Sequence, residues 1–228
     1  MIVSVHLPKT AGNSLKDALK REFKDRLLLD YDDWAGYRSP ESDARTAANA
    51  VAMRSRRDEL LANFDAIHGH FIADKYVGLF PDTHFVAFFR DPFQQTLSQY
   101  HFLLRIPHAR VHPAVRILHD EKMTLEDFII WGATKDPQTQ CVGAVALEDF
   151  AMVGLVEEYP RSVRLFQMIF GRALSSDIFE NVNPERANGD YPIDAELRKI
   201  IQIHRAADID LYRRAKDLFA QQAGRRAV

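Results

Sequence analysis

The sequence has very little cysteine, with Cys141 as the one thiol in 228 residues. A disulfide within the chain is therefore impossible, and so is a zinc site built from several thiolates. We expect Cys141 to be a small buried apolar residue. Long apolar runs are also missing, since the cluster from Phe85 to Phe89 is far shorter than the ~18–20 residues of a membrane span.

An excess of charge of either sign is absent as well. The chain has 30 Lys and Arg residues against 32 Asp and Glu residues, which leaves a net charge of −2. This balance excludes a globally basic nucleic-acid-binding protein, although it allows a local basic site. The N-terminus lacks the basic and apolar segments of a signal peptide. We therefore expect a cytoplasmic protein with no nucleic-acid partner.

Repeats, low-complexity tracts and Gly/Ser linkers are absent too, so residues 1–228 are expected to form one domain. Short apolar runs alternate with segments whose apolar residues recur at helical spacing. The expected strands are 2–6, 27–29, 66–68, 83–89 and 152–156. The expected helices are 14–23, 42–64, 93–105, 125–131, a segment ending at 170, and 194–222. This alternation predicts an α/β fold with a mostly parallel central sheet flanked by helices.

The segment HLPKTAGNSL leads from the first expected strand into the first helix. Lys9 supplies a cationic ammonium, and Thr10, Asn13 and Ser14 supply hydrogen-bond donors. Gly12 allows close approach of a ligand to the backbone, and the free N–H groups of the following helix favour an anion. The segment predicts a phosphate or sulfate cradle, although it lacks the glycine–lysine order of a Walker A loop. A plain strand–helix turn with a surface lysine is the alternative.

A second basic segment, FFRDPFQQTLSQY, follows the most apolar expected strand. Arg90 stands at the end of that strand, where a guanidinium can bind a phosphate in a bidentate manner. Ser98 lies two turns into the next helix and can add a hydroxyl donor. The alternative is an Arg–Asp surface pair beside a serine that packs a helix.

Together the two segments resemble the sulfotransferases that use 3′-phosphoadenosine 5′-phosphosulfate (PAPS). They look most like the carbohydrate group that includes the heparan sulfate and uronyl 2-O-sulfotransferases. One departure is Gln95, where that family often has arginine. Five shorter stretches also resemble segments of that family, each more weakly, and they occur in the family's order: HGH at 68–70, DPQTQ at 136–140, VGLVEEYPRSVRLF at 153–166, NVNP at 181–184 and DIDLYRRA at 208–215.

The resemblance implies a P-loop-like, three-layer α/β fold and PAPS as co-substrate, with no metal. It implies that the first loop binds the 5′-phosphosulfate, through Lys9, Thr10, Ala11, Gly12, Asn13 and Ser14. It further implies that Arg90 and Ser98 bind the 3′-phosphate, and that Asn183 and Arg186 lie in a loop that closes over it.

Sulfuryl transfer to a hydroxyl requires stabilisation of the leaving phosphate and a general base. Lys9 is the candidate for the first task. Histidine suits the second because its ordinary pKa is about 6.5. The family's base corresponds to His70, with His68 as the alternative, and a purely structural role for either remains open. We expect His6 to be structural.

The acceptor site is expected in the loops 31–42 and 106–113. Four aromatic residues are candidate sugar platforms: Trp34, Tyr37, Tyr76 and Trp131. Basic residues near the second loop could favour an acidic acceptor such as a uronate-containing glycan, or could simply form a solvated helix face: His101, Arg105, His108, Arg110, His112, Arg116 and His119. Asp208 and Asp210 are expected to face solvent or cap a helix, so they predict no metal site.

These features predict a sulfotransferase that moves the sulfuryl group from PAPS to a hydroxyl of a carbohydrate or small acceptor and releases 3′,5′-ADP. An ATP–Mg²⁺-dependent, P-loop-like kinase is one alternative, which the missing Walker A glycine disfavours. A non-catalytic nucleotide- or glycan-binding module is the other. Gln95 mildly favours such a module, whereas Lys9, His70, Arg90 and Ser98 disfavour it.

Overall fold

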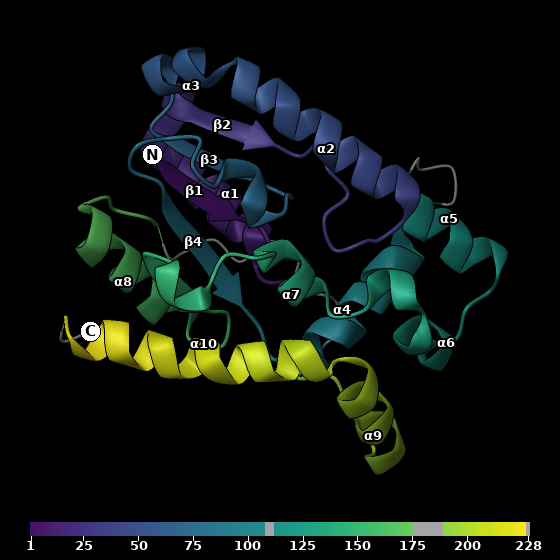
Figure 1. Ribbon diagram of the computed structural model, residues 1–228. Coiled ribbons are helices and arrows are strands. Elements are labelled where there is room, and N and C mark those ends of the chain that lie inside the picture. Colours follow the sequence, from purple (N-terminus) through teal and green to yellow (C-terminus); the bar gives the residue numbers. More distant parts are fainter. Residues whose placement is uncertain (108–111, 176–188, 227–228) are drawn as a thin grey trace.

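Figure 1 shows the computed structural model, which describes residues 1–107, 112–175 and 189–226. In this part of the chain five strands form one sheet in the order β2-β3-β1-β4-β5, and each neighbouring pair is parallel. β1 lies at the centre, where Val3 pairs with Ile67 on one side and Phe85 on the other. The strands are β1 (Ile2–Val5), β2 (Leu27–Asp30), β3 (Ala66–Gly69), β4 (His84–Phe89) and β5 (Met152–Leu155).

The apolar runs form strands because helices and loops cover both of their faces. All residues of β1, β3 and β5 are buried, and in β4 only His84, at the first position, is exposed. A doubly covered parallel sheet requires such nearly continuous apolar strands. The predicted α/β fold with a central parallel sheet is therefore confirmed. The carboxyl ends of the strands share one edge, which is where ligands bind in sheets of this kind.

Helices pack against the sheet and against one another. α1 contacts β2, while α8 and α10 contact the edge strand β5. α2 and α10 run along opposite sides of the molecule, and α4, α5, α6 and α9 gather at one end of it (Figure 1). The helices are α1 (Gly12–Phe23), α2 (Pro40–Ser55), α3 (Arg57–Asn63), α4 (Pro92–Arg105), α5 (Pro113–Asp120), α6 (Leu125–Ile130), α7 (Pro137–Val142), α8 (Tyr159–Phe170), α9 (Ala195–His204) and α10 (Ala206–Gly224), with the 3₁₀ turns η1 (Lys24–Arg26), η2 (Ala73–Tyr76), η3 (Gly132–Thr134) and η4 (Leu147–Asp149).

The two longest expected helices are each broken by an arginine. The 42–64 segment divides into α2 and α3 at Arg56, and the 194–222 segment divides into α9 and α10 at Arg205. Both arginines leave the helical conformation, with φ/ψ of −103°/11° and −127°/29°. Arg205 is buried and donates from Nη1 to the backbone carbonyls of Ile129 and His204. The helix break at Arg205 places its guanidinium beside the buried carbonyl of Ile129, which needs a hydrogen-bond donor.

Of the two positions expected for Asp208, facing solvent or capping a helix, the structure shows the second, because Asp208 is fully buried and caps the start of α7. Its carboxylate accepts hydrogen bonds from the backbone N–H groups of Gln138 and Thr139 at the start of α7. Burial raises the pKa of Asp208 to about 6. Asp210, by contrast, lies on the surface and pairs with Arg213 across 2.7 Å.

The helix expected at 125–131 is α6, and Thr124 caps it in a capping box with Asp127. Cys141 is fully buried, as expected of a small apolar residue. None of the described helices combines the length and the apolar character that a bilayer-spanning segment would need.

Candidate active site

The loop between β1 and α1 contains two residues with positive φ. Lys9 and Ala11 have positive φ values of 62° and 60°, which side-chain-bearing residues seldom adopt. Left-handed residues spaced in this way can turn neighbouring N–H groups toward a common point. Ala11 is also the residue before α1, and its side chain caps none of the helix N–H groups. The first turn of α1 therefore offers donors to an anion beyond the sheet edge.

Gly12 is required for packing as well as for ligand approach. A Cβ atom at this position would lie 1.7 Å from Nε2 of His6, far inside van der Waals contact. The His6 ring thus occupies the space that a side chain on residue 12 would need. Thr10 supports the loop from within, because its buried hydroxyl donates to the backbone carbonyl of Leu7 across 2.9 Å.

A cavity of about 1070 Å³ collects most of the predicted site residues. Its wall includes Lys9 from the loop, Arg90 from the end of β4 and His70 from the end of β3. The other predicted residues in the wall are Ala11, Gly12, Asn13, Ser14 and Ser98. Thr10 and His68 do not line this cavity, and Asn183 and Arg186 lie outside the described residues, as does the NVNP stretch.

Positive charge is concentrated where Lys9 enters the cavity. Burial, with Arg90 and Arg105 nearby, lowers the pKa of Lys9 to about 8. The Lys9 ammonium lies 4.0 Å from the centre of the Phe102 ring on α4, a contact that the sequence did not predict. Arg90 is buried and donates from Nη1 to the backbone carbonyl of Lys9 across 3.1 Å. An anion placed between these cations would relieve their mutual repulsion.

Gln95 has a structural task that needs no charge. Its fully buried side chain donates from Nε2 to the backbone carbonyl of Pro8 and to Oε1 of Gln99. These bonds tie α4 to the loop that carries Lys9. A neutral amide therefore braces the loop at the position where the resembled sulfotransferases often have arginine.

Three histidine rings lie together beneath the loop. His6 stacks on His70 with ring centres 3.9 Å apart, and on His68 with centres 5.1 Å apart. His70 donates from Nδ1 to the backbone carbonyl of His6. Burial lowers the pKa of His70 to about 4 and that of His68 to about 3. Both rings are therefore neutral at pH 7.

The two candidate bases occupy different environments. His68 belongs to β3, is fully buried, and its Nδ1 lies 2.9 Å from the hydroxyl of Ser4. His70 follows β3 and lines the cavity. Gly69 lies between them in the sequence. A Cβ atom at this position would lie 1.6 Å from the carbonyl oxygen of Asp30 on β2, so no larger residue fits there. The glycine thus permits close packing of β2 and β3.

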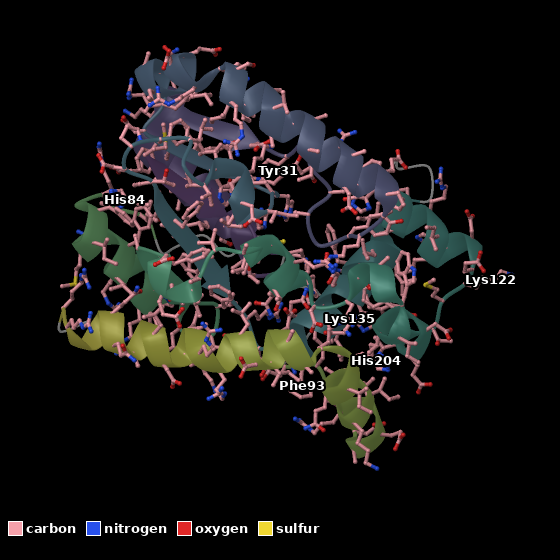
Figure 2. The ribbon with its side chains drawn as sticks, in the orientation of Figure 1. Tyr31, His84, Phe93, Lys122, Lys135 and His204 are labelled. Carbon is pink, nitrogen blue, oxygen red and sulfur yellow. The ribbon has the colours of Figure 1, made fainter. Side chains whose placement is uncertain are left out.

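Both predicted acceptor loops reach the same cavity. Trp34 and Tyr37 line it, and their rings lie 5.7 Å and 5.6 Å from that of His112. Tyr31, labelled in Figure 2, follows β2 directly and its hydroxyl lies 2.9 Å from Nδ1 of His6. Tyr31 belongs to the acceptor loop expected at 31–42, and the sequence does not indicate its contact with His6. Asp33, at the same wall, is held by the buried ammonium of Lys75, 3.0 Å away.

Two of the four candidate platforms do not line this cavity. Tyr76 is fully buried and its hydroxyl donates to Oδ2 of Asp30. Trp131 packs beside Tyr37, with ring centres 5.7 Å apart.

The basic residues near the second acceptor loop are not one group. Arg105 and His112 line the cavity, whereas the His101 ring stacks on that of Tyr191. His119 bonds through Nε2 to the backbone carbonyl of Ile106, and Arg116 is exposed. His108 and Arg110 lie outside the described residues.

Comparison with known proteins supports the fold. No protein-family model matches the sequence, and no curated protein matches it. A sulfotransferase from Alicyclobacillus acidocaldarius has a similar structure, with a TM-score of 0.50 and 16% identity over 96% of this chain and 94% of that one. Mouse sulfotransferase SULT7A1 complexed with PAP matches with a TM-score of 0.43 and 13% identity, over 91% of this chain and 64% of the mouse chain. This chain thus spans less than two thirds of the mouse protein. The first likeness shows a sulfotransferase-like α/β fold.

Proposed function

We propose that the protein is a sulfotransferase that moves the sulfuryl group from PAPS to a hydroxyl of an acceptor and releases 3′,5′-ADP. The observation that carries this proposal is the meeting of Lys9, His70, Arg90 and Ser98 in one cavity at the carboxyl edge of the sheet. These four residues come from three separate segments of the chain, with Arg90 and Ser98 in one of them. Their common location is what one site for an anionic nucleotide and a base would require.

The loop before α1 would hold the phosphosulfate. Lys9, the N–H groups of residues 11–14 and the Ser14 hydroxyl would bind its oxygens. As the bond between sulfur and the bridging oxygen breaks, negative charge grows on the 5′-phosphate. Lys9 would stabilise that charge, in the way that fixed cations assist phosphoryl transfer. Thr10 would support this loop from beneath through its bond to Leu7.

Arg90 and Ser98 would bind the 3′-phosphate. A guanidinium offers paired donors that fit two phosphate oxygens, and a nearby hydroxyl can add a third. Both side chains are largely buried, so a phosphate bound there would be shielded from water. Asn183 and Arg186 remain proposed partners for the same phosphate.

His70 would act as the base. Because its Nδ1–H is committed to the carbonyl of His6, Nε2 carries the lone pair. The acceptor hydroxyl would attack sulfur and pass its proton to Nε2 as the bond between sulfur and the leaving phosphate breaks. A bound anionic nucleotide would raise the pKa of His70 from its low resting value and so strengthen the base.

The acceptor would enter beside Trp34, Tyr37 and His112. Flat aromatic rings can bind the apolar face of a sugar, and this supports the proposed carbohydrate acceptor. Arg105 could pair with an acidic group on such an acceptor. The nucleotide and the acceptor would then approach His70 from different walls of one cavity.

Thermal unfolding with 3′,5′-ADP, 5′-ADP and ATP–Mg²⁺ tests the proposal. Ligand at 100 times its Kd should add about 2.7 kcal/mol. For a chain of this size that is a rise of roughly 5–10 °C in Tm. We expect the large rise with 3′,5′-ADP. A rise with ATP–Mg²⁺ alone would favour phosphoryl transfer, and 3′,5′-ADP binding without turnover of PAPS across an acceptor screen would favour a binding module.

A further inference from the structure

The backbone of Arg90 is held by a side-chain amide. β4 ends at Phe89, so Arg90 is the first residue beyond the strand. Oε1 of Gln138 accepts a hydrogen bond from the N–H of Arg90 at 3.0 Å, and Nε2 donates to the carbonyl of Arg90 at 2.9 Å. Gln138 is almost fully buried. One amide thus satisfies both backbone groups of Arg90, in place of a neighbouring strand.

Gln138 is held in turn by the C-terminal helix. Oδ2 of Asp208 on α10 accepts from the N–H of Gln138 at 3.1 Å, and Oδ1 accepts from the N–H and hydroxyl of Thr139, both at 2.7 Å. The N–H of Asp208 donates to Oδ1 of Asp136 at 3.1 Å. Asp136 and Asp208 therefore fix α7 to α10 from both directions, and α7 has little freedom to move its glutamine.

A continuous series of bonds connects these residues with the nucleotide loop. It runs from Asp208 through Gln138 to the backbone of Arg90, and from the Arg90 guanidinium to the carbonyl of Lys9. A long arginine side chain loses substantial rotamer entropy when it is ordered. Fixing its backbone lowers the number of orientations that the guanidinium can take. Small displacements of a binding group can weaken its contact severely.

We propose that Gln138 is a positioning residue that orients Arg90 for the 3′-phosphate of the nucleotide, with Asp208 holding Gln138 in place. The inference rests on the proposed function. The inference adds to the proposed site a residue that makes no contact with the nucleotide, since Gln138 does not line the cavity. A purely structural glutamine would contribute to stability, whereas a positioning glutamine contributes specifically to recognition of the 3′-phosphate.

Gln138→Met separates the two roles, because methionine has a similar length and lacks the amide. Gln140→Met is the matched control: Gln140 is on the same helix and also largely buried, but its amide donates to the carbonyl of Lys135. Calorimetry would give the Kd of 3′,5′-ADP and of 5′-ADP for the wild type, both variants, Arg90→Ala and the Arg90→Ala/Gln138→Met double variant.

We expect Gln138→Met to reduce the preference for 3′,5′-ADP over 5′-ADP by about tenfold or more. The affinity for 5′-ADP should change little, and Gln140→Met should keep the wild-type preference. In the Arg90→Ala background Gln138→Met should cause no further loss, since coupled residues are not additive. An equal loss in both backgrounds, or an unchanged preference, would overturn the inference and leave the proposed function intact. No preference in the wild type would overturn both.

Asp208→Asn provides a second route if Gln138→Met does not fold. The new amide nitrogen would face either the N–H of Gln138 or the donors of Thr139, so one hydrogen bond at the start of α7 is lost while the shape is kept. We expect a smaller reduction in the same preference, with 5′-ADP binding unchanged. Equal weakening of both nucleotides would show a structural role and overturn the inference.

Discussion

The Nδ1 atom of His70 and the backbone carbonyl of His6 are 2.7 Å apart. A carbonyl only accepts hydrogen bonds, so Nδ1 of His70 carries the proton and Nε2 has the lone pair. Burial lowers the pKa of His70 to about 4, with some opposition from this bond. The ring is thus neutral and held in one tautomer before any ligand binds. The candidate base is ready at neutral pH without an acidic partner.

His70→Gln should abolish most turnover while the fold and nucleotide binding remain. Glutamine keeps a polar group of similar reach but removes the basic nitrogen, and loss of a general base typically costs 10²–10⁴ in rate. The measurement is kcat with PAPS and a turned-over acceptor, together with the Kd of 3′,5′-ADP. His68→Gln is the control, because His68 does not line the cavity. A His70→Gln enzyme with wild-type kcat would remove His70 from the mechanism.

Lys9 should make nucleotide binding depend on pH in the alkaline range. Its lowered pKa of about 8 means that the ammonium is present below that pH and is lost above it. Affinity for 3′,5′-ADP should therefore decline as pH rises from about 7 to 9.5. The groups around Lys9 include Arg90, Arg105, His6 and His70. Burial lowers the pKa of His6 and of His70, so both rings stay neutral over this range.

Two Lys9 variants provide the comparison. Lys9→Arg keeps its charge throughout, so its affinity should not decline over that range. Lys9→Ala should bind weakly at every pH and lose turnover, because the leaving phosphate loses its cation. Titration calorimetry at steps of half a pH unit measures each profile. The same decline in Lys9→Arg as in the wild type would assign the titration to another group.

The buried histidines should make the fold sensitive to acid. His68 has a pKa of about 3 in the folded protein, against about 6.5 when unfolded. Between these values the unfolded state binds more protons, so stability is complete above about pH 6.5 and is lost as pH falls. Over pH 6.5 to 4 this amounts to on the order of 3 kcal/mol for His68. His70 acts in the same direction, whereas Asp208, with its raised pKa, opposes them.

His68→Gln isolates that contribution. Urea unfolding of both proteins between pH 4 and 7 should show a smaller dependence on pH in the variant. Ser4 lies within hydrogen-bond distance of residue 68, so glutamine has a polar partner available there. Parallel curves for the two proteins would mean that His68 has the same pKa in the folded and unfolded states, contrary to its assignment as a buried ring that resists protonation.

The sequence predicts the sheet well because its strands are buried on both faces. The run before Arg90 is apolar at almost every position, and no amphipathic helix has that composition. The helix breaks at Arg56 and Arg205 could not be predicted, since arginine is a good helix former. Arg205 leaves the helix to reach the carbonyl of Ile129, which is distant in the sequence. The spacing of apolar residues within a helix does not indicate such a long-range contact.

The site was predictable only in part, for related reasons. The loop and Arg90 follow strands directly, and topology alone brings them to one edge. The preference for His70 over His68 comes from the family resemblance, because both histidines belong to one short HGH segment. The strand expected at 66–68 leaves His70 outside it, and β3 does end at Gly69, so His68 stays in the sheet and His70 reaches the cavity. The bonds of Gln138 join residues about 50 to 70 positions apart, which no motif displays.

Gly12→Ala should disturb both the loop and the base. The added Cβ would meet the His6 ring at 1.7 Å, and a stacked ring wedged between neighbours cannot move without displacing His70 or Tyr31. Overpacking of this kind typically costs 1–3 kcal/mol, which urea unfolding would measure. His6→Ala/Gly12→Ala should recover part of that stability, because the smaller side chain removes the clash. If Gly12→Ala alone is as stable as the wild type, the His6 ring does not fill that space and Gly12 serves only the approach of the ligand.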